Sequence, residues 1–208
     1  DMNPINEIAK RHNLWVVEDA ACGFGATYFG QHVGILGTTG CFSFHPRKAL
    51  TTGEGGMVTT LDSELADRIR CLRDHGATMS DLQRHLGAKP YLLADHPEAG
   101  YNQRMTDIQG ALGSAQMARA YEIVLERRRL ANIYNDAFVG LDWLRIPSCY
   151  EGYEHGYQSY PCMFRPENLD LENVKEVNQA RNAWMEALQI AGISTRPATH
   201  AVHMLSYY

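Results

Sequence analysis

The sequence lacks the features that mark membrane-spanning and nucleic-acid-binding proteins. Its longest apolar runs fall far short of the roughly 20 residues that cross a bilayer. It has no block of Lys and Arg, and no basic stripe interleaved with aromatic residues. The formal net charge is −5 and 21% of the residues are charged, which are ordinary values for a globular protein. We therefore expect neither a membrane nor a nucleic acid as a partner.

Cysteine is sparse and irregularly placed. The five cysteines are odd in number, scattered, and without the spacing of a metal site: Cys22, Cys41, Cys71, Cys149 and Cys162. This pattern predicts reduced thiols in a cytoplasmic protein. A histidine pair, His200 and His203, lacks two further ligands at a sensible spacing, so no metal site is expected.

A lysine and an aspartate carry the clearest chemical signal. Lys48 follows the segment Phe42–Phe44 and precedes the glycine cluster Gly53–Gly56, and Asp19 ends an apolar run that begins at Leu14. A pyridoxal phosphate enzyme needs such a pair. The amine forms a Schiff base with the cofactor aldehyde, and the carboxylate keeps the pyridine nitrogen protonated. A solvated lysine and a turn-forming aspartate are the alternatives that these residue types leave open.

Alternating strand-like and helix-like segments predict an α/β fold. Hydrophobic periodicity and turn residues place strands near residues 14–19, 41–44, 57–60, 160–165 and 193–196, with a short hairpin near 28–32. The same signals place helices over residues 5–12, 62–76, 106–138 and 173–191. A smaller α+β part is expected after about residue 125.

Four separated motifs, in the same order, resemble the DegT/DnrJ/EryC1/StrS family. They are Val17–Ala21, Phe42–Gly56, Gly100–Thr106 and Gly192–Pro197, and the resemblance covers nearly the whole chain. Members are fold-type I pyridoxal phosphate enzymes, mostly aminotransferases acting on nucleotide-linked keto sugars. The resemblance implies a partial large domain over residues 1–124, with a mostly parallel sheet and helices, and a partial small α+β domain over 125–208. Because members are nearly twice as long, we expect the chain to be a fragment that lacks the N-terminal part.

The resemblance assigns cofactor-binding roles to five residues. Lys48 would hold pyridoxal 5′-phosphate and shuttle protons, and Asp19 would pair with the pyridine nitrogen. The Ser43 hydroxyl would bind the cofactor phosphate. Cys22 stands near the cofactor where many relatives have glutamine, and its thiol is a weak donor. Asn102 would reach the cofactor phosphate of the neighbouring subunit, which implies a homodimer with a shared active site.

Two arginines are candidates for substrate binding. The planar guanidinium of Arg104 suits a phosphate or a carboxylate, because it donates two parallel hydrogen bonds. Arg196 lies in a segment that resembles the small-domain entry to the family's substrate site. For Ser43, Asn102 and Arg104, a solvated strand or loop residue stays the alternative.

Together these features imply transfer of an amino group to a keto group of a nucleotide-linked deoxy sugar, with glutamate as the donor. The Gly100–Met105 pattern looks most like branches that aminate the sugar 4-position. A dehydratase branch has histidine in place of the lysine, so Lys48 favours transamination. The alternatives are other chemistry of the family, such as sugar dehydration or cyclitol transamination, and a catalytically silent fragment that acts as an interaction or regulatory module.

Overall fold

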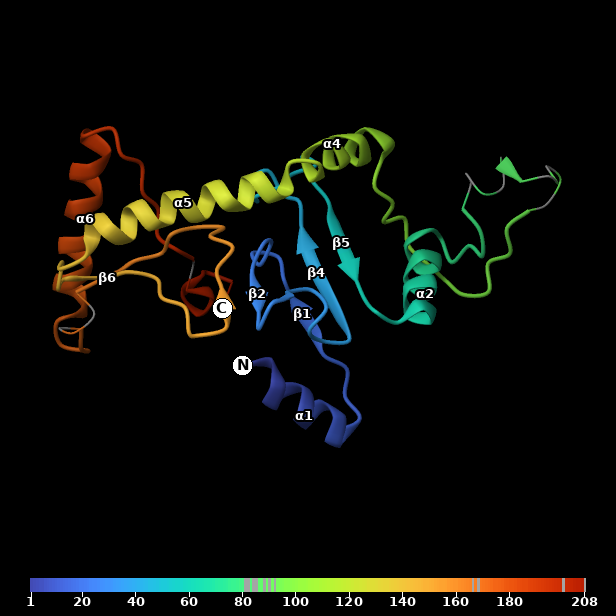
Figure 1. Cartoon of the computed structure of the whole chain (residues 1–208), viewed down its shortest axis with the longest axis horizontal. Coiled ribbons are helices and arrows are strands. Elements are labelled where there is room, and N and C mark those ends of the chain that lie inside the picture. The colour runs from blue at the N-terminus through green and yellow to red at the C-terminus, as the bar shows by residue number, and fades with distance from the viewer. Residues whose placement is uncertain are drawn as a thin grey trace. The chain divides into compact units, whose positions relative to one another are not determined.

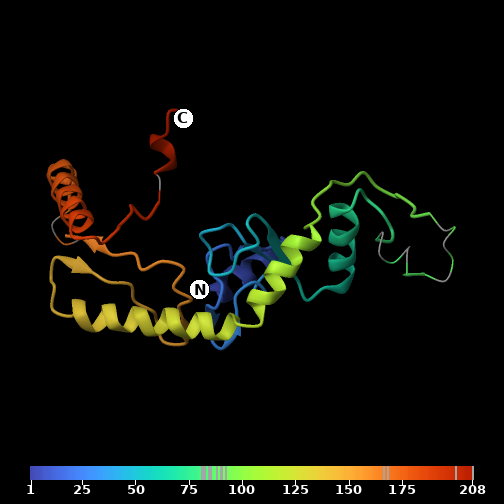
Figure 2. The same cartoon turned by 90° about the horizontal axis from the view of Figure 1, so that it is seen from above.

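The computed structural model describes residues 1–80, 83, 86–87, 89, 91, 93–165, 167, 169–199 and 201–207. The chain forms two compact units, one of residues 1–128 and 149–158 and the other of residues 129–148 and 159–208. Figures 1 and 2 show the elements of both. The predicted division into domains at residues 124 and 125 stays a prediction.

A three-stranded sheet lies at the centre of the first unit. β1 (Val17–Asp19) pairs in parallel with β4 (Thr39–Ser43), and β4 pairs in antiparallel fashion with β5 (Gly56–Thr59), as Figure 1 shows. α1 (Met2–His12) precedes this sheet. Among the described strands, the expected mostly parallel character therefore holds for one pairing of this sheet, that of β1 with β4.

A second small sheet of the same unit contains the predicted hairpin. β2 (Thr27–Tyr28) and β3 (Gln31–His32) pair in antiparallel fashion across Phe29 and Gly30. Both turn residues have positive φ, 46° and 78°, as a tight two-residue hairpin turn requires. β7 (Tyr153–Glu154) pairs with the other edge of β2. A segment that follows far later in the sequence thereby joins the first unit.

Side-chain caps define the helices of the first unit. Asp62 caps α2 (Ser63–Arg73) by accepting hydrogen bonds from two backbone N–H groups of its first turn. Thr106 and Gln109 form a reciprocal capping box at the start of α4 (Asp107–Met117). The single helix predicted over 106–138 is two helices in the structure. A turn at residues 118 and 119 separates α4 from α5 (Ala120–Phe138).

The second unit contains two short strands and a helix. β6 (Leu144–Arg145) pairs with β8 (Met163–Phe164), and α6 (Val174–Ile190) and the 3₁₀ helix η2 (Val202–Met204) follow. The rings of Trp143 and Trp184, 5.0 Å apart, join the strands to α6. Among the described helices of both units, none is long and apolar enough to cross a membrane.

The strand predicted at residues 193–196 is wrong. These residues form no strand in the structure. Ile193 N–H instead donates to Leu188 O at 2.8 Å, and Pro197, which follows, has no N–H to donate to a ladder. The strand predicted over residues 160–165 shortens to the two residues of β8.

Close packing of Gly40 in β4 against Gly34 yields a test of the fold. A methyl group on Gly40 would lie 2.2 Å from the Cα of Gly34, so Gly40→Ala should lower the free energy of unfolding by about 1–3 kcal/mol. Gly110→Ala is the matched control, because Gly110 lies in α4 and has open space around it. It should raise stability by up to about 1 kcal/mol. Urea denaturation measures both. Equal midpoints for Gly40→Ala and the native chain would contradict the packing.

Candidate active site

Four of the predicted cofactor-binding residues gather at one edge of the central sheet. Asp19 is the last residue of β1 and Ser43 the last of β4. Because the two strands are parallel and Asp19 is in register with Cys41, both side chains leave the sheet at its carboxyl edge. Cys22 and Lys48 lie in the segments that follow these strands. Open α/β sheets bind ligands at this edge.

The Lys48 amine is in direct contact with the Cys22 thiol. Lys48 Nζ lies 2.9 Å from Cys22 Sγ, and the lysine is half-buried while the cysteine is exposed. The backbone N–H of Lys48 donates to the carbonyl of His45 at 2.9 Å. A turn that begins at His45 therefore aims the lysine side chain toward the end of β1.

Local hydrogen bonds orient Asp19 and Ser43. Asp19 Oδ1 accepts from the N–H of Ala21 at 3.1 Å, and the Ser43 hydroxyl oxygen accepts from the N–H of His45 at 3.3 Å. Since the Ser43 oxygen is the acceptor in this contact, its hydroxyl proton can be donated to a ligand. A carboxylate oxygen accepts more than one hydrogen bond, so Asp19 also keeps capacity for a partner.

Residues 44–55, the lysine loop, close on themselves at the base. Phe44 N–H donates to Gly55 O at 2.8 Å, and Thr52 N–H donates back to Phe44 O at 3.0 Å. The Thr51 hydroxyl donates to the same carbonyl at 3.0 Å. The loop that carries Lys48 is thus fixed at the point where it leaves β4.

Two glutamines of α4 fix the far part of the lysine loop. Gln116 accepts from the N–H of Thr51 at 3.1 Å and donates to the carbonyl of the same residue at 2.5 Å. Gln109 donates to Glu54 O at 2.8 Å. Neither contact was predicted from the sequence. The spacing of Thr106 and Gln109 is typical of a capping box, so it indicates that Gln109 lies in the first turn of α4. No local pattern indicates a role for Gln116.

Glu18 organises the turn beside the site. Its Oε1 accepts from Gly34 N–H at 2.6 Å and its Oε2 accepts from Leu36 N–H at 3.1 Å. Successive strand residues point to opposite faces, so Glu18 and its neighbour Asp19 serve different partners. The Glu18 carboxylate therefore has a structural role. From the sequence alone, this role could not be distinguished from that of the adjacent Asp19.

Asn102 and Arg104 lie beside the end of α2. Asn102 is exposed and forms an antiparallel bridge with Asp74, whose carboxylate also pairs with the Arg104 guanidinium. Arg104 lines a cavity of about 360 Å³ together with His75 and His96. In the described part of the chain, neither side chain is hydrogen-bonded to the lysine loop. Their predicted roles therefore stay predictions.

Arg196 lies in the second unit. It is exposed and belongs to the irregular stretch after α6, and its role in substrate binding also stays a prediction. His200 of the sequence-level histidine pair lies outside the described residues. Across the described ranges, no group of three or more His, Cys, Asp or Glu side chains is placed to hold a metal ion.

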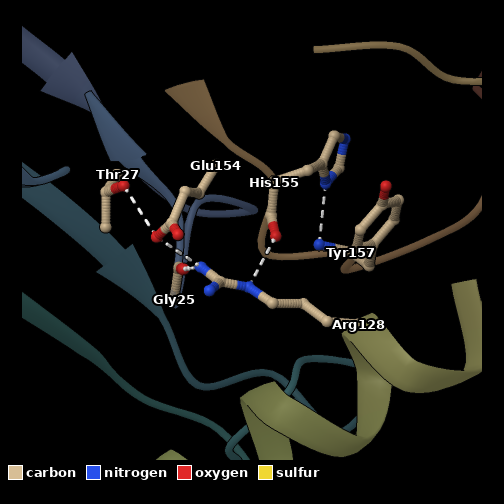
Figure 3. A network of polar contacts seen from close by, with 6 residues as sticks. All are labelled: Gly25, Thr27, Arg128, Glu154, His155 and Tyr157. Carbon is tan, nitrogen blue, oxygen red and sulfur yellow. Dashed lines mark hydrogen bonds and ion pairs between the residues drawn. The ribbon is translucent and has the colours of Figure 1, made fainter. Parts of the chain in front are cut away.

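The segment 154–158, called the strap below, is held by a polar network that Figure 3 shows. Arg128 donates to Gly25 O at 2.9 Å, to Glu154 Oε2 at 3.0 Å and to His155 O at 3.3 Å. Thr27 donates to the same carboxylate oxygen at 3.0 Å. This hydrogen bond and the charge of Arg128 hold the pKa of Glu154 below its ordinary value.

A cavity of about 970 Å³ lies next to this network. Its lining is mostly apolar and comes from the hairpin, α5 and the end of α4. None of the predicted site residues lines it. The candidate active site is therefore the carboxyl edge of β1 and β4, where the amine, carboxylate and hydroxyl are found, and not the larger hollow.

The sequence matches the DegT/DnrJ/EryC1/StrS aminotransferase family over residues 1–208. The chain belongs to this family. GDP-perosamine synthase from Caulobacter vibrioides is 36% identical, with 100% of this chain and 51% of that protein covered. The GDP-perosamine synthase of Escherichia coli O157:H7 is 35% identical over 100% of this chain and 50% of its own length. The chain spans about half the length of the curated relatives it matches.

A solved structure gives the same result for the fold. Sugar aminotransferase CalS13 from Micromonospora echinospora superposes with a TM-score of 0.79 at 29% identity, covering 100% of this chain and 52% of that one. The α/β fold of the fold-type I aminotransferases is thereby confirmed for this chain. Pyridoxal phosphate is the cofactor of this family.

The residues at the sheet edge fit that cofactor. Its aldehyde requires a primary amine, which Lys48 presents beside Cys22. Its pyridine nitrogen requires a carboxylate, and its phosphate requires hydroxyl or N–H donors, which Asp19 and Ser43 offer from adjacent parallel strands. The three groups are of the chemical types that the aldehyde, the ring nitrogen and one phosphate oxygen of the cofactor require.

Protonation of His155 should weaken the strap. Burial lowers the pKa of His155, and its Nδ1 accepts from Tyr157 N–H at 2.7 Å, a bond that protonation at Nδ1 removes. The unfolded chain then binds this proton at a higher pH than the folded chain does. Stability is therefore complete above the ordinary histidine pKa and falls as the pH drops through it. Glu154 stays ionised in this window, because its own pKa is lowered.

The measurement is urea denaturation at about pH 7.5 and about pH 5.5. The native chain should lose about 0.5 kcal/mol more between the two than His155→Asn, a small difference because the ring is partly open to solvent. His12→Asn, at an exposed position in α1, is the control and should behave as the native chain does. A parallel loss in the native chain and in His155→Asn would rule out this origin.

Proposed function

We propose that this chain carries the lysine-bearing part of the active site of a pyridoxal phosphate-dependent aminotransferase that acts on a nucleotide-linked keto sugar. The observation that carries the proposal is the Lys48 amine, held at the carboxyl edge of two parallel strands that also supply Asp19 and Ser43. Family membership supports the reaction class. A histidine in place of Lys48 would have favoured dehydration instead.

Each residue at the edge has a defined task. When bound, the cofactor supplies an electron sink that stabilises negative charge on the substrate carbon next to nitrogen. Lys48 would hold the cofactor through Nζ and, once the amino donor displaces it, accept and return a proton at that atom. Asp19 would keep a proton on the pyridine nitrogen, and the Ser43 hydroxyl would donate to the phosphate.

Cys22 would act on the amine itself. Its sulfur contacts Lys48 Nζ at 2.9 Å and so restricts the positions that the lysine side chain can take. A thiol is a poorer donor than the glutamine amide found in many relatives. Cys22 would therefore contribute contact with Lys48 rather than a strong hydrogen bond to the cofactor ring.

The proposal extends to the substrate and the partners. Two relatives are named GDP-perosamine synthase, which supports a nucleotide-linked sugar as acceptor. A deoxy sugar as this acceptor and glutamate as donor come from the family resemblance of the sequence. Asn102 would serve the site of a second subunit, and Arg104 and Arg196 would contact the substrate. Large apolar side chains that remain exposed, such as Trp15 at 69% and Ile108 at 84%, support association into a homodimer. A cytoplasmic location stays a prediction from cysteine usage.

Replacement of Lys48 tests the proposed function. Lys48→Arg keeps the positive charge but removes a primary amine, so it should slow amino transfer from glutamate to the cofactor by at least about 100-fold. The absorbance change from the aldehyde to the amine form of the cofactor measures this rate in the purified chain. Lys10→Arg, in α1, is the control and should keep the native rate. Native rates in Lys48→Arg would refute the assignment.

Replacement of Asp19 tests the electron-sink arrangement. An amide cannot stabilise a protonated pyridine nitrogen, so Asp19→Asn should slow the same half-reaction by about 10–100-fold. Asp67→Asn in α2 removes an exposed ion pair with Arg70 and should leave the rate unchanged. If both variants react at the native rate, Asp19 has no part in activating the cofactor.

A further inference from the structure

The peptide unit between Arg47 and Lys48 is fixed at both of its polar atoms. The N–H of Lys48 donates to His45 O at 2.9 Å. The carbonyl of Arg47 accepts from the Gln158 side-chain amide at 2.5 Å. Because these two atoms lie in the plane of the peptide, the two bonds together fix that plane and restrict the directions in which the Lys48 side chain can leave the backbone. One of them comes from a residue of the strap, over a hundred positions further along the chain.

The strap is rigid enough to serve as a fixed point. Arg127 of α5 donates to the carbonyls of Tyr157 and Gln158 at 2.9 and 3.3 Å. Gly156 is buried so closely that a methyl group on it would lie 2.3 Å from Phe24 O. Tyr157 adopts φ 48°, a left-handed conformation that is costly for a tyrosine and persists only where the surroundings impose it.

The Arg128 network of Figure 3 anchors the other end of the strap. It ties Glu154 and His155 to Thr27 and Gly25, so the strap is attached both to the hairpin sheet and to α5. Residues 149–158 belong to the first unit, whereas the flanking residues 129–148 and 159–208 belong to the second. Gln158 is the last residue of the segment 149–158.

We propose that Gln158 is a positioning residue for Lys48, acting through the Arg47–Lys48 peptide; the assignment rests on the proposed function of Lys48. The glutamines of α4 hold the loop at Thr51 and Glu54, beyond the lysine. Gln158 holds it at the peptide bond of the lysine itself. An amide suits this position, because it donates to a carbonyl oxygen that a carboxylate would repel.

The first test measures amide hydrogen exchange in the cofactor-free 208-residue chain by mass spectrometry. Gln158→Leu keeps the size of the side chain and removes the donor, so the Lys48 amide should exchange about fivefold faster. Gln158→Glu should accelerate it further, and Gln158→Arg, which keeps a donor, should restore most of the protection. Peptides of α2 should keep the native rate in each variant. Gln189→Leu, at an exposed position of α6, is the control.

The second test follows the absorbance of the cofactor on Lys48 as a function of pH. A change in the direction of the amine alters its contact with Cys22 and with the cofactor, so Gln158→Leu should shift the titration midpoint, whereas Gln189→Leu should keep the native value. A general loss of stability would instead speed exchange in α2 as well, and that result would overturn the proposal. So would native exchange rates and a native midpoint in Gln158→Leu. Equal retention of the cofactor by the native chain and by Lys48→Arg would refute the proposed function, while the exchange experiment still decides the role of Gln158.

Discussion

The site depends on the parallel pairing of β1 with β4. Only this pairing, with Asp19 in register with Cys41, places a carboxylate and a hydroxyl at the same edge of one sheet. An antiparallel partner such as β5 runs in the opposite direction and would carry its terminal side chains to the other end. Everything that follows, the turn at Cys22 and the loop to Lys48, starts from this shared edge.

The lysine loop has little regular secondary structure, and hydrogen bonds from side-chain amides hold it in place. Gln109, Gln116 and Gln158 each donate to a carbonyl of the loop. A neutral amide bonds to a backbone carbonyl without placing a charge next to the reactive amine, which an arginine or lysine would do. The loop is therefore held by neutral groups, and Lys48 Nζ keeps its contact with Cys22 Sγ.

Local sequence predicted β1, β4, β5, the hairpin and the starts of α2 and α4, because short-range physics determines them. Gly30 marks a turn, Asp62 and Thr106 mark helix starts, and the motif around Lys48 marks the reactive loop. The glutamine contacts and the strap could not be predicted this way. Gln158 and Arg47 are 111 positions apart, and nothing in the composition near either residue indicates the other. At residues 193–196 the error was of the other kind: strand-like residue types predicted a strand, and the structure has none there.

The most direct measurement is borohydride reduction of the purified chain mixed with pyridoxal phosphate, followed by peptide mapping. A single stable adduct is expected on Lys48, well above the labelling of Lys10, Lys89 and Lys175, and it should disappear in Lys48→Arg. Adduct spread evenly over the four lysines, or an unchanged pattern in the variant, would contradict the assignment of this sheet edge as the cofactor site.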